Sequence, residues 1–504
     1  MNAATAKAPN ILILMADQMT PRVLSAYGGR VAKTPNIDRL AQEGVVFENA
    51  YCNSPLCAPS RYALMSGQLP SATGGYDNAS EFPADTPTFA HYLRAAGYLT
   101  LLSGKMHFCG ADQLHGFEER LTTDIYPADF GWTPDWTRPG ERLDWYHNMD
   151  SVTRAGPCVR TNQLDFDEEV IFAARQKLFD LARRGDGRPF CMVVSVTHPH
   201  DPFTIAEPWW SRHSEEDIDG PRTTVGAAPG DPHAERLRQV IGLRDQSVSD
   251  EEIRAARRAY YGACAFVDDG FGQILSALAD TRLAEDTVVI VIADHGEMLG
   301  ERGLWYKMNF FEPACRIPMI VHAPRRFAAG RIKASVSLVD ILPTLLDLAQ
   351  TAPVLAAPIA GRSLLPHLNG APGPDGVVGE YLAEGAISPL VMLRQGQWKF
   401  IHCPADPDQL YDLETDPEEL NNLATDSGHA AVVADFKAQV ADRWNLQRLH
   451  EQVLASQRRR RLVDQALGQG RYQAWDYQPL RYASQLYMRN TMKLDDLEAR
   501  ARFP

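Results

Sequence analysis

The stretch Asn10-Ile11-Leu12-Ile13-Leu14-Met15-Ala16 runs directly into Asp17 and Gln18. A short apolar run without polar alternation is typical of a strand that is buried on both faces of a parallel sheet. In open sheets of this kind, ligands bind beyond the carboxyl ends of the strands. The stretch therefore predicts an α/β fold with a functional site next to Asp17.

The chain beyond this stretch alternates between helical and extended patterns. Apolar residues at helical spacing between glycine or proline boundaries predict helices, and continuous apolar runs predict further buried strands. The expected fold is α/β, with a large central, mostly parallel sheet sandwiched by helices. Predicted strands cover residues 10–16, 45–47, 99–103, 189–197, 287–293 and 318–323, and predicted helices cover residues 34–44, 89–97, 166–183 and 249–283, with another from residue 337.

Changes in composition divide the chain into three parts. Residues 1–375 form the expected catalytic domain, with an irregular, aromatic insertion at residues 116–165. Residues 376–430 are expected to form a small C-terminal α+β subdomain with strands at 396–402 and 409–413. Residues 431–504 form a helical segment and an aromatic tail from residue 471, which we expect to dock on a neighbouring subunit; docking on its own subunit is the alternative.

Bulk properties exclude some classes of function. The chain has 504 residues and a formal net charge of −14, which argues against nucleic-acid binding and mildly favours a cationic substrate. Eight cysteines lack the spacing of a disulfide framework or a Cys-x-x-Cys motif, so we expect reduced thiols. The apolar run at residues 11–16 is shorter than a usual signal-peptide core, and no stretch reaches membrane-spanning length. These features predict a cytoplasmic protein without a membrane anchor.

The motif Cys57-Ala58-Pro59-Ser60-Arg61 begins a predicted helix. Pro59 suits the first turn of a helix, which places Cys57 just before the N-terminus, where unpaired N–H groups favour negative charge. A lone cysteine there would usually be an ordinary buried residue. However, Cys-x-Pro-Ser-Arg followed by Ser66-Gly67 resembles the signature of the type I sulfatases, which belong to the alkaline phosphatase superfamily.

This resemblance implies an alkaline-phosphatase-like fold and an unusual nucleophile. It implies that a formylglycine-generating enzyme converts Cys57 to formylglycine after translation. Residue 57 would then act as a hydrated aldehyde. One geminal oxygen attacks the sulfur of a sulfate monoester, and the other expels sulfate as the aldehyde re-forms.

Two further carboxylates are expected to meet near residue 57. Asp17 and Asp294 each follow an apolar strand, and parallel strands bring such residues to one sheet edge. Either aspartate alone would more often cap a helix, but the pair with Cys57 favours a site for one divalent cation, with His295 as a further ligand. The family resemblance implies Ca²⁺. Because Gln18 replaces a usual second carboxylate and His295 adds a nitrogen, Mn²⁺ or Mg²⁺ remains an alternative.

The expected chemistry also needs cations and proton carriers, because negative charge grows on the leaving oxygen of a sulfate ester. Arg61 would fix the aldehyde hydrate, and Lys105 and Lys307 would bind sulfate oxygens or protonate the leaving group. His107 and His200 would carry protons, while His198 is the less favoured histidine of its pair.

Within the family, the chain most resembles the choline sulfatases. The similar segments are residues 76–79, 104–110, 124–136 and 474–479. A quaternary ammonium has no hydrogen-bond donor, so its recognition needs aromatic faces and a nearby carboxylate. The resemblance implies hydrolysis of a small cationic ester, choline-O-sulfate, by a homo-oligomer, either dimer or tetramer. The expected substrate-binding residues are Asn78, Trp132, His147, Asn148 and Glu384.

Two alternatives remain open from the sequence. The first is a phosphonate monoester or phosphodiester hydrolase of the same superfamily, with the same nucleophile and metal. The second is an unconverted, non-catalytic protein that binds a sulfated or phosphorylated metabolite. The state of residue 57 separates the second alternative from an enzyme, since only conversion supplies the aldehyde.

Overall fold

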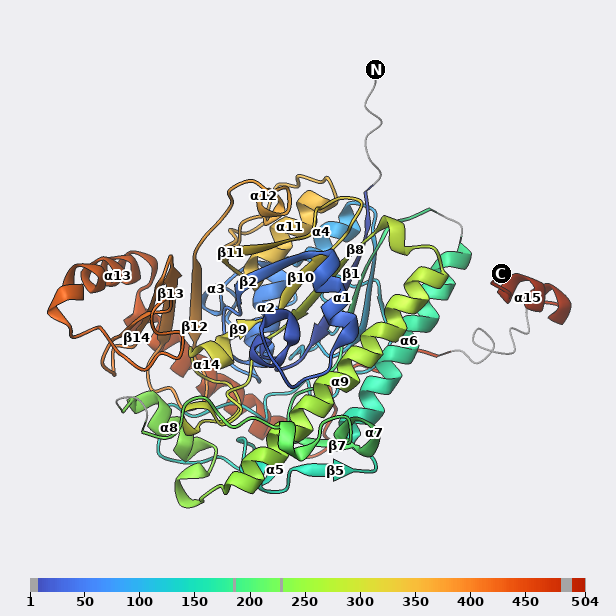
Figure 1. Cartoon of the computed structure of the whole chain (residues 1–504). Coiled ribbons are helices and arrows are strands. Elements are labelled where there is room, and N and C mark those ends of the chain that lie inside the picture. Colours follow the sequence, from blue (N-terminus) through green and yellow to red (C-terminus); the bar gives the residue numbers. More distant parts are fainter. Residues whose placement is uncertain (1–7, 185–186, 227–229, 482–491, 504) are drawn as a thin grey trace.

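A computed structural model describes residues 8–184, 187–226, 230–481 and 492–503 of the protein. A large mixed sheet forms its centre (Figure 1). Residues 1–7, which precede the apolar run compared above with a signal-peptide core, lie outside the described residues. None of the helices within the described ranges is long and apolar enough to cross a membrane.

The central sheet is mostly parallel, as predicted. Strand β1 lies between β6 and β8 and pairs with both in parallel, and β3 continues the parallel set beyond β6. Strand β10 runs antiparallel between β8 and β2. In order across the sheet the strands are β11 (Gly330–Ser337), β2 (Val45–Tyr51), β10 (Met319–His322), β8 (Thr287–Ala293), β1 (Asn10–Ala16), β6 (Phe190–Ser195), β3 (Leu99–Gly104) and β4 (Glu119–Arg120), and β9 (Arg316–Ile317) pairs with β2.

The innermost strands are buried because their side chains are apolar on both faces. Every residue of β8 is buried, and so are Ile11 to Ala16 of β1. Each fully buried Val, Leu or Ile side chain contributes about 1.5–3 kcal/mol relative to exposure. The continuous apolar runs in the sequence therefore predicted these strands correctly.

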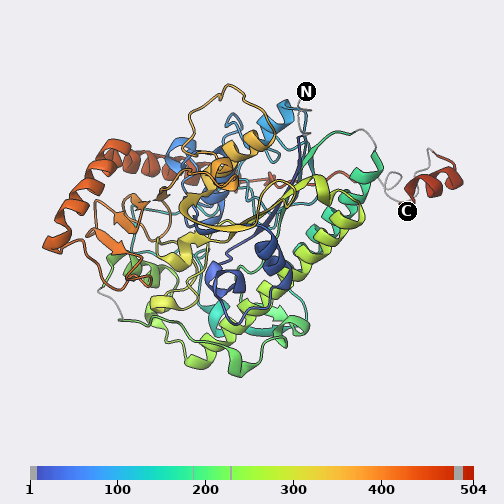
Figure 2. The same cartoon turned by 45° about the horizontal axis from the view of Figure 1, so that its top comes forward.

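Helices cover both faces of the sheet, as Figures 1 and 2 show. On one face, α9 packs on α1 and α6, and on the other α11 packs on α2 and α4. Helix α9 starts at a capping box in which Ser249 and Glu252 satisfy each other's backbone N–H groups. The ranges are α1 (Pro35–Glu43), α2 (Cys57–Ser66), α4 (Phe89–Ala95), α6 (Asn162–Arg184), α9 (Asp250–Asp280) and α11 (Ile341–Leu348). Shorter helices are α3 (Pro70–Thr73), α5 (Asp150–Thr153), α7 (Glu207–Trp210), α8 (Pro232–Val240), α10 (Glu312–Cys315) and α12 (Leu365–Leu368).

A four-stranded antiparallel sheet forms the smaller C-terminal part. Its order is β12 (Val377–Tyr381), β13 (Leu390–Gln395), β14 (Trp398–His402) and β15 (Gln409–Asp412). The predictions at 396–402 and 409–413 are confirmed, whereas β12 and β13 were not predicted as strands. Helix α13 (Ala430–Arg443) covers this sheet with Phe436 against Phe400, and α14 (Leu446–Leu467) follows.

The insertion is largely irregular, as predicted, and the tail packs on it. The insertion contains β4, α5 and β5 (Gly156–Cys158), and β5 pairs with β7 (Thr204–Ala206). Trp475 packs on Phe130 with ring centroids 5.2 Å apart, and Asp476 Oδ1 accepts a hydrogen bond from Ala128 N at 2.9 Å. Trp475 and Asp476 of the tail therefore contact the insertion of the same chain. Residues 482–491 lie outside the described residues, and α15 (Leu494–Ala501) stands apart from the main body in Figure 1.

A buried ion cluster joins the small sheet to the catalytic domain. Lys399 of β14 has a completely buried side chain, and its Nζ lies 2.9 Å from Glu312 Oε1 and 2.5 Å from Glu419 Oε1. The same ammonium donates to Phe310 O at 2.8 Å. Burial opposes ionisation of Glu312, but Lys399 lowers the pKa of this carboxyl to about 2. The cluster thus fixes the segment that follows Lys307.

Replacing Lys399 by Met should destabilise the protein, because two buried carboxylates would lose their shared cation. Breaking a buried pair in this way costs about 3–5 kcal/mol. Thermal unfolding should show a clearly lower midpoint. The matched control is Lys437→Met, since Lys437 is about half exposed and pairs with Asp408. Equal midpoints for the two variants would contradict this assignment.

Candidate active site

Helix α2 begins at Cys57, one residue earlier than expected, and every residue of the helix is buried. The side chain of the N-cap residue Leu56 makes no hydrogen bond to the backbone N–H groups of the first turn. Instead, Asn78 Oδ1 accepts a hydrogen bond from Ala58 N at 3.0 Å. Ser60 Oγ donates to Asp294 O at 2.5 Å, which ties the first turn of α2 to the end of β8. Residue 57 is thereby held at the sheet edge.

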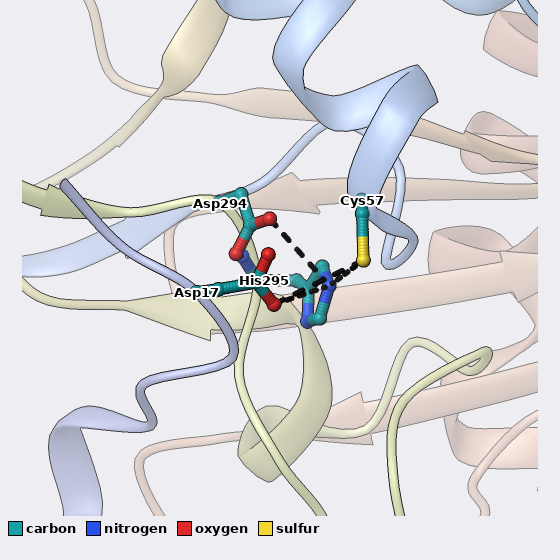
Figure 3. Close-up of side chains that lie close together, drawn as sticks. All are labelled: Asp17, Cys57, Asp294 and His295. Carbon is teal, nitrogen blue, oxygen red and sulfur yellow. Dashed lines mark hydrogen bonds and ion pairs between the residues drawn. The ribbon is translucent and has the colours of Figure 1, made fainter. Parts of the chain in front are cut away.

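Asp17, Cys57, Asp294 and His295 meet at this edge (Figure 3). Their potential ligand atoms all lie within 4.8 Å of one another, and all four residues are buried. Cys57 Sγ is 3.2 Å from His295 Nε2 and 3.9 Å from Asp17 Oδ1. The expectation that these four residues would come together from separate parts of the chain agrees with this geometry.

The Arg61 guanidinium ties together the carboxyl ends of four adjacent strands. Its Nε donates to Asp294 Oδ2 at 2.9 Å after β8, and its Nη2 donates to Asp17 Oδ2 at 2.8 Å after β1. Its Nη1 donates to Ser195 Oγ at 2.9 Å in β6 and to Lys105 O at 2.6 Å after β3. Every nitrogen of the side chain therefore has an acceptor, and the group contacts the carboxylates and not residue 57.

Burial and neighbouring charges shift the pKa values of three of the four clustered residues, Asp17, His295 and Cys57. Burial opposes ionisation of Asp17, but Lys105, His200 and Arg61 lower the pKa of this carboxyl well below its usual range. Burial, together with Lys307, lowers the pKa of His295. Its Nδ1 lies 3.0 Å from the carbonyl oxygen Gly296 O, so Nδ1 carries the proton of the neutral ring and Nε2 keeps its lone pair. Burial and the Asp17 charge raise the pKa of the Cys57 thiol to about 11.

This donor set fits a hard divalent cation. Asp17 binds its cationic neighbours through Oδ2, which leaves Oδ1 facing Cys57 and His295. Two carboxylates suit Ca²⁺, Mg²⁺ or Mn²⁺, and a hydroxyl oxygen of converted residue 57 would replace the soft sulfur of the thiol. Gln18 does not join the four ligands, since its side chain points to other partners.

Lys307 and His200 form a second group beside these ligands. Lys307 Nζ donates to Gln18 Oε1 at 2.5 Å and to His200 Nε2 at 2.8 Å. His200 Nδ1 lies 2.7 Å from Asp201 O, so this nitrogen carries the proton. Burial and the charge of Lys307 lower the pKa of His200 well below its usual value. His198, by contrast, hydrogen-bonds to Asp167 and packs on Phe266.

His147, His200 and Asp201 could by spacing alone form another metal cluster. The Lys307 ammonium, however, lies within hydrogen-bonding distance of His200 Nε2. A bound cation would face this positive charge in a buried place, which is unfavourable. We therefore assign no metal to these three residues.

Lys105 and His107 lie on the other side of the carboxylates. Lys105 Nζ forms an ion pair with Asp17 Oδ2 and lies 4.1 Å above the centre of the Tyr126 ring. Neither ring nitrogen of His107 has a hydrogen-bond partner within the described residues. Burial and the charge of Lys105 lower the pKa of His107 to about 3, so the ring is neutral near pH 7. The Trp132 ring stands edge-on to His107 at 5.8 Å.

Aromatic residues and one carboxylate extend the site away from residue 57. Trp132 packs between Tyr126 and Trp145, and Trp145 contacts Tyr146. Glu384 is 3% exposed, and in the part of the chain that the structure describes its Oε2 has no hydrogen-bond partner. Burial raises the pKa of Glu384 to about 7, and the charges of Asp77 and Lys307 also influence it.

The other expected substrate residues have different surroundings. The His147 ring stacks on Tyr306 at 4.5 Å and lies 5.7 Å from the His200 ring. Asn148 is exposed, and its Oδ1 accepts from Asp150 N at 2.9 Å at the start of α5. Asn78 is buried and caps α2. The structure thus brings His147 to the site, whereas the Asn148 side chain serves its own turn.

Several residues of this site were not predicted. Gln18 positions Lys307, Ser195 accepts from Arg61, and Tyr126 covers Lys105. Asp17 and Asp294 were identified because they follow apolar strands. Ser195 lies at the end of another apolar strand, so the same rule could also have identified it. Tyr126 lies in irregular chain, where no periodic signal exists.

Comparisons with known proteins agree with this geometry. The family model described as Sulfatase matches residues 9–351. Two further models match the C-terminal part: N-sulphoglucosamine sulphohydrolase, C-terminal, at residues 300–445, and Choline sulfatase enzyme C terminal at residues 451–503.

Individual relatives and solved structures extend over most of the chain. It is 46% identical to a choline-sulfatase from Rhizobium meliloti (strain 1021), with 98% of both chains covered. It is 30% identical to arylsulfatase K from Gallus gallus, with 82% of this chain and 79% of the relative covered. The crystal structure of a phosphonate monoester hydrolase from Agrobacterium radiobacter has a TM-score of 0.68 at 25% identity, covering 88% of this chain and 96% of that chain. Family model, relatives and site geometry lead to one conclusion: the chain belongs to the sulfatase family, within the alkaline phosphatase superfamily.

Proposed function

We propose that this protein hydrolyses choline-O-sulfate to choline and sulfate. The observation that carries the substrate choice is Glu384, a buried carboxylate whose Oε2 lacks a hydrogen-bond partner among the described residues and which lies near aromatic rings. Burying a carboxylate without a partner is costly, and a quaternary ammonium would supply the missing charge. The similarity to a choline-sulfatase over 98% of the chain supports the same substrate.

The nucleophile in this proposal is residue 57 after conversion to formylglycine by a formylglycine-generating enzyme. With a pKa of about 11, the Cys57 thiol is protonated near neutral pH and is therefore a poor nucleophile. A hydrated aldehyde offers one hydroxyl for attack on sulfur and a second whose deprotonation releases sulfate. Its place at the N-terminus of α2 favours the negative charge that attack creates.

The four clustered residues would hold one divalent cation, Ca²⁺ in the first instance. Such a cation would polarise the ester and lower the pKa of the hydroxyl on residue 57. Arg61 and Lys105 pair with the carboxylates of this cluster, and Lys307 lies beside Gln18. These three cations would attract the sulfate group of the ester.

Lys105 and Lys307 would bind the sulfate oxygens, since Lys105 pairs with Asp17 and Lys307 lies beside Gln18 and His200. The neutral His200 ring accepts a hydrogen bond from Lys307, which orients this ammonium. His107 has two unpartnered ring nitrogens among the described residues and is neutral, so one can donate and the other can accept a hydrogen bond. We assign protonation of the leaving oxygen to the ammonium group of Lys105 or Lys307, which would then recover its proton from water.

A phosphonate or phosphodiester substrate would use the same nucleophile and cations. The structural likeness to phosphonate monoester hydrolases concerns the shared fold. Glu384 Oε2, which has no hydrogen-bond partner among the described residues, favours an ester with a cationic group instead. Eight free cysteines support a cytoplasmic location. The tail from residue 471 remains the proposed contact between subunits of a homo-oligomer, although Trp475 and Asp476 pack on their own chain.

Cys57→Ala should abolish turnover of choline-O-sulfate, with a loss of at least about a thousandfold, because no aldehyde can form. Far-ultraviolet circular dichroism should remain that of the wild type. Cys264→Ala is the matched control, since Cys264 is a buried cysteine of α9 outside the site. Wild-type turnover by Cys57→Ala would disprove the assignment of the nucleophile.

Elemental analysis of the purified protein should find about one divalent ion per chain. Asp294→Asn should reduce this content strongly, because the site loses one of two anionic ligands. Asp347→Asn, an exposed change on α11, should leave it unaltered. An unchanged metal content in Asp294→Asn would place the ion elsewhere.

Glu384→Gln should raise KM for choline-O-sulfate about tenfold or more, with little change for 3,3-dimethylbutyl sulfate, an analogue of the same shape in which a neutral quaternary carbon replaces the ammonium nitrogen. The wild type should also show a pH effect. Because the carboxyl must be ionised to attract the ammonium, KM for choline-O-sulfate should fall as pH rises through the pKa of about 7. Steady-state kinetics on both esters over this range measure the effect. Parallel pH profiles for the two esters would exclude Glu384 as the partner of the ammonium.

A further inference from the structure

The C-terminal helix α14 contacts the catalytic domain through a buried arginine. The Arg460 side chain is 6% exposed, and it forms a two-pronged ion pair with Asp77, which is completely buried. Nη1 lies 2.7 Å from Asp77 Oδ1, and Nη2 lies 2.7 Å from Asp77 Oδ2. The neighbouring Arg459 is exposed. Arg460 is thus the buried arginine of the run at residues 458–461, whereas Arg461 pairs with Asp135 at a half-buried position.

Asp77 directly precedes Asn78, and its carboxylate shapes the turn that carries Asn78. Asp77 Oδ1 accepts hydrogen bonds from Ala79 N at 3.0 Å and from Ser80 Oγ at 3.1 Å. Asn78 in turn caps the helix that begins at residue 57. Arg460 therefore acts on this turn through a carboxylate that is already fixed.

The same guanidinium reaches the turn that carries Trp132. Arg460 Nη1 donates to Thr133 Oγ1 at 3.0 Å, and this hydroxyl donates to Phe130 O at 2.7 Å. The backbone N–H of Thr133 also donates to Phe130 O at 3.2 Å. This turn presents the Trp132 ring to His107 and Tyr126.

A second residue on α14 is linked through Trp136 to the segment that precedes Glu384. Gln457 Oε1 accepts from Trp136 N at 2.9 Å, and Trp136 Nε1 donates to Ala383 O at 2.9 Å, next to Glu384. Residues 457 and 460 are three apart and lie on one helix face. That face thus contacts the segments that carry Asn78, Trp132 and Glu384.

We infer that Arg460 is a positioning residue that fixes the relative placement of Asn78 and Trp132, and so helps to set selectivity for the cationic ester. The inference rests on the proposed choline-O-sulfate hydrolysis. Arg460 touches none of the four clustered ligands or Lys105 and Lys307 among the described contacts. Its loss should therefore affect binding of the choline end and spare the chemistry at sulfur.

The planar guanidinium is well suited to this function. Two parallel hydrogen bonds to one carboxylate fix its plane, and the remaining N–H can then reach a third group. A lysine would keep the charge but cannot hold Asp77 and Thr133 in this fixed geometry. The negative charge of Asp77 contributes to the raised pKa of Glu384. The ion pair with Arg460 partly offsets that charge.

The test compares wild type, Asp77→Asn/Arg460→Met, Arg460→Lys and the exposed control Arg459→Met. The double variant removes both charges, because Arg460→Met alone would leave a buried carboxylate unpaired and could unfold the chain. For the double variant we expect KM for choline-O-sulfate to rise about tenfold with kcat within about twofold. Arg460→Lys should lie between it and the wild type, and Arg459→Met should match the wild type.

Choline binding supplies a readout that does not depend on conversion of residue 57. In a Cys57→Ala background, calorimetric titration with choline should show affinity about tenfold weaker when Asp77→Asn/Arg460→Met is added. A merely structural contribution would lower the melting temperature and the active fraction while leaving KM and choline affinity unchanged, and that result would overturn the inference. A wild type that does not hydrolyse choline-O-sulfate would overturn the proposed function itself.

Discussion

The Arg61 guanidinium is the contact on which the candidate site depends most. It lies in the first turns of α2 and hydrogen-bonds to groups at the ends of β8, β1, β6 and β3, which are neighbours in the sheet. The strands can present these groups together because they run parallel and in matched register, with Ala16 opposite Ala293. Asp17 and Asp294 are the next residues on each strand. The register of β1 and β8 thus sets the distance between the two carboxylates.

The buried charges of the site are stable only as a set. Taking a single carboxylate out of water costs several kcal/mol, and that cost falls when cations lie within hydrogen-bonding distance. Asp17 has two such neighbours, Arg61 and Lys105, and its pKa is lowered despite complete burial. The same cations, with Lys307, leave the site attractive to an anionic ester. Stability of the metal ligands and affinity for sulfate therefore come from the same positive charges.

Much of this arrangement was predicted from the sequence, because a continuous apolar run that stops at a polar residue marks the end of a buried strand. The apolar runs at residues 10–16 and 287–293 predicted strands, and their following residues, Asp17 and Asp294, were correctly expected to meet. The small sheet was only half predicted. Gly379 lies in the middle of β12, where glycine weakens a strand pattern, yet a Cβ at this position would lie 2.6 Å from the Phe310 ring. The glycine is required by packing that only the folded chain reveals.

Contacts between distant, irregular segments could not be predicted in this way. Asp77 and Arg460 are 383 positions apart, and the arginine lies in a run of four arginines at residues 458–461. Gln18 was recognised only as the replacement for a usual second carboxylate, whereas the structure shows its amide oxygen accepting a hydrogen bond from Lys307. Such partners depend on how loops pack on the sheet, for which single-sequence periodicity carries no signal. The motif around Cys57 was more informative because family resemblance supplied its chemistry.

The chemical state of residue 57 is the most direct test of this account. Mass spectrometry of the tryptic peptide that runs from Leu40 to Arg61 should be performed on a preparation that hydrolyses choline-O-sulfate. We expect a peptide that has lost one sulfur and two hydrogens and gained one oxygen, as formylglycine at residue 57 requires. An active preparation in which this peptide carries only unmodified Cys57 would contradict the account.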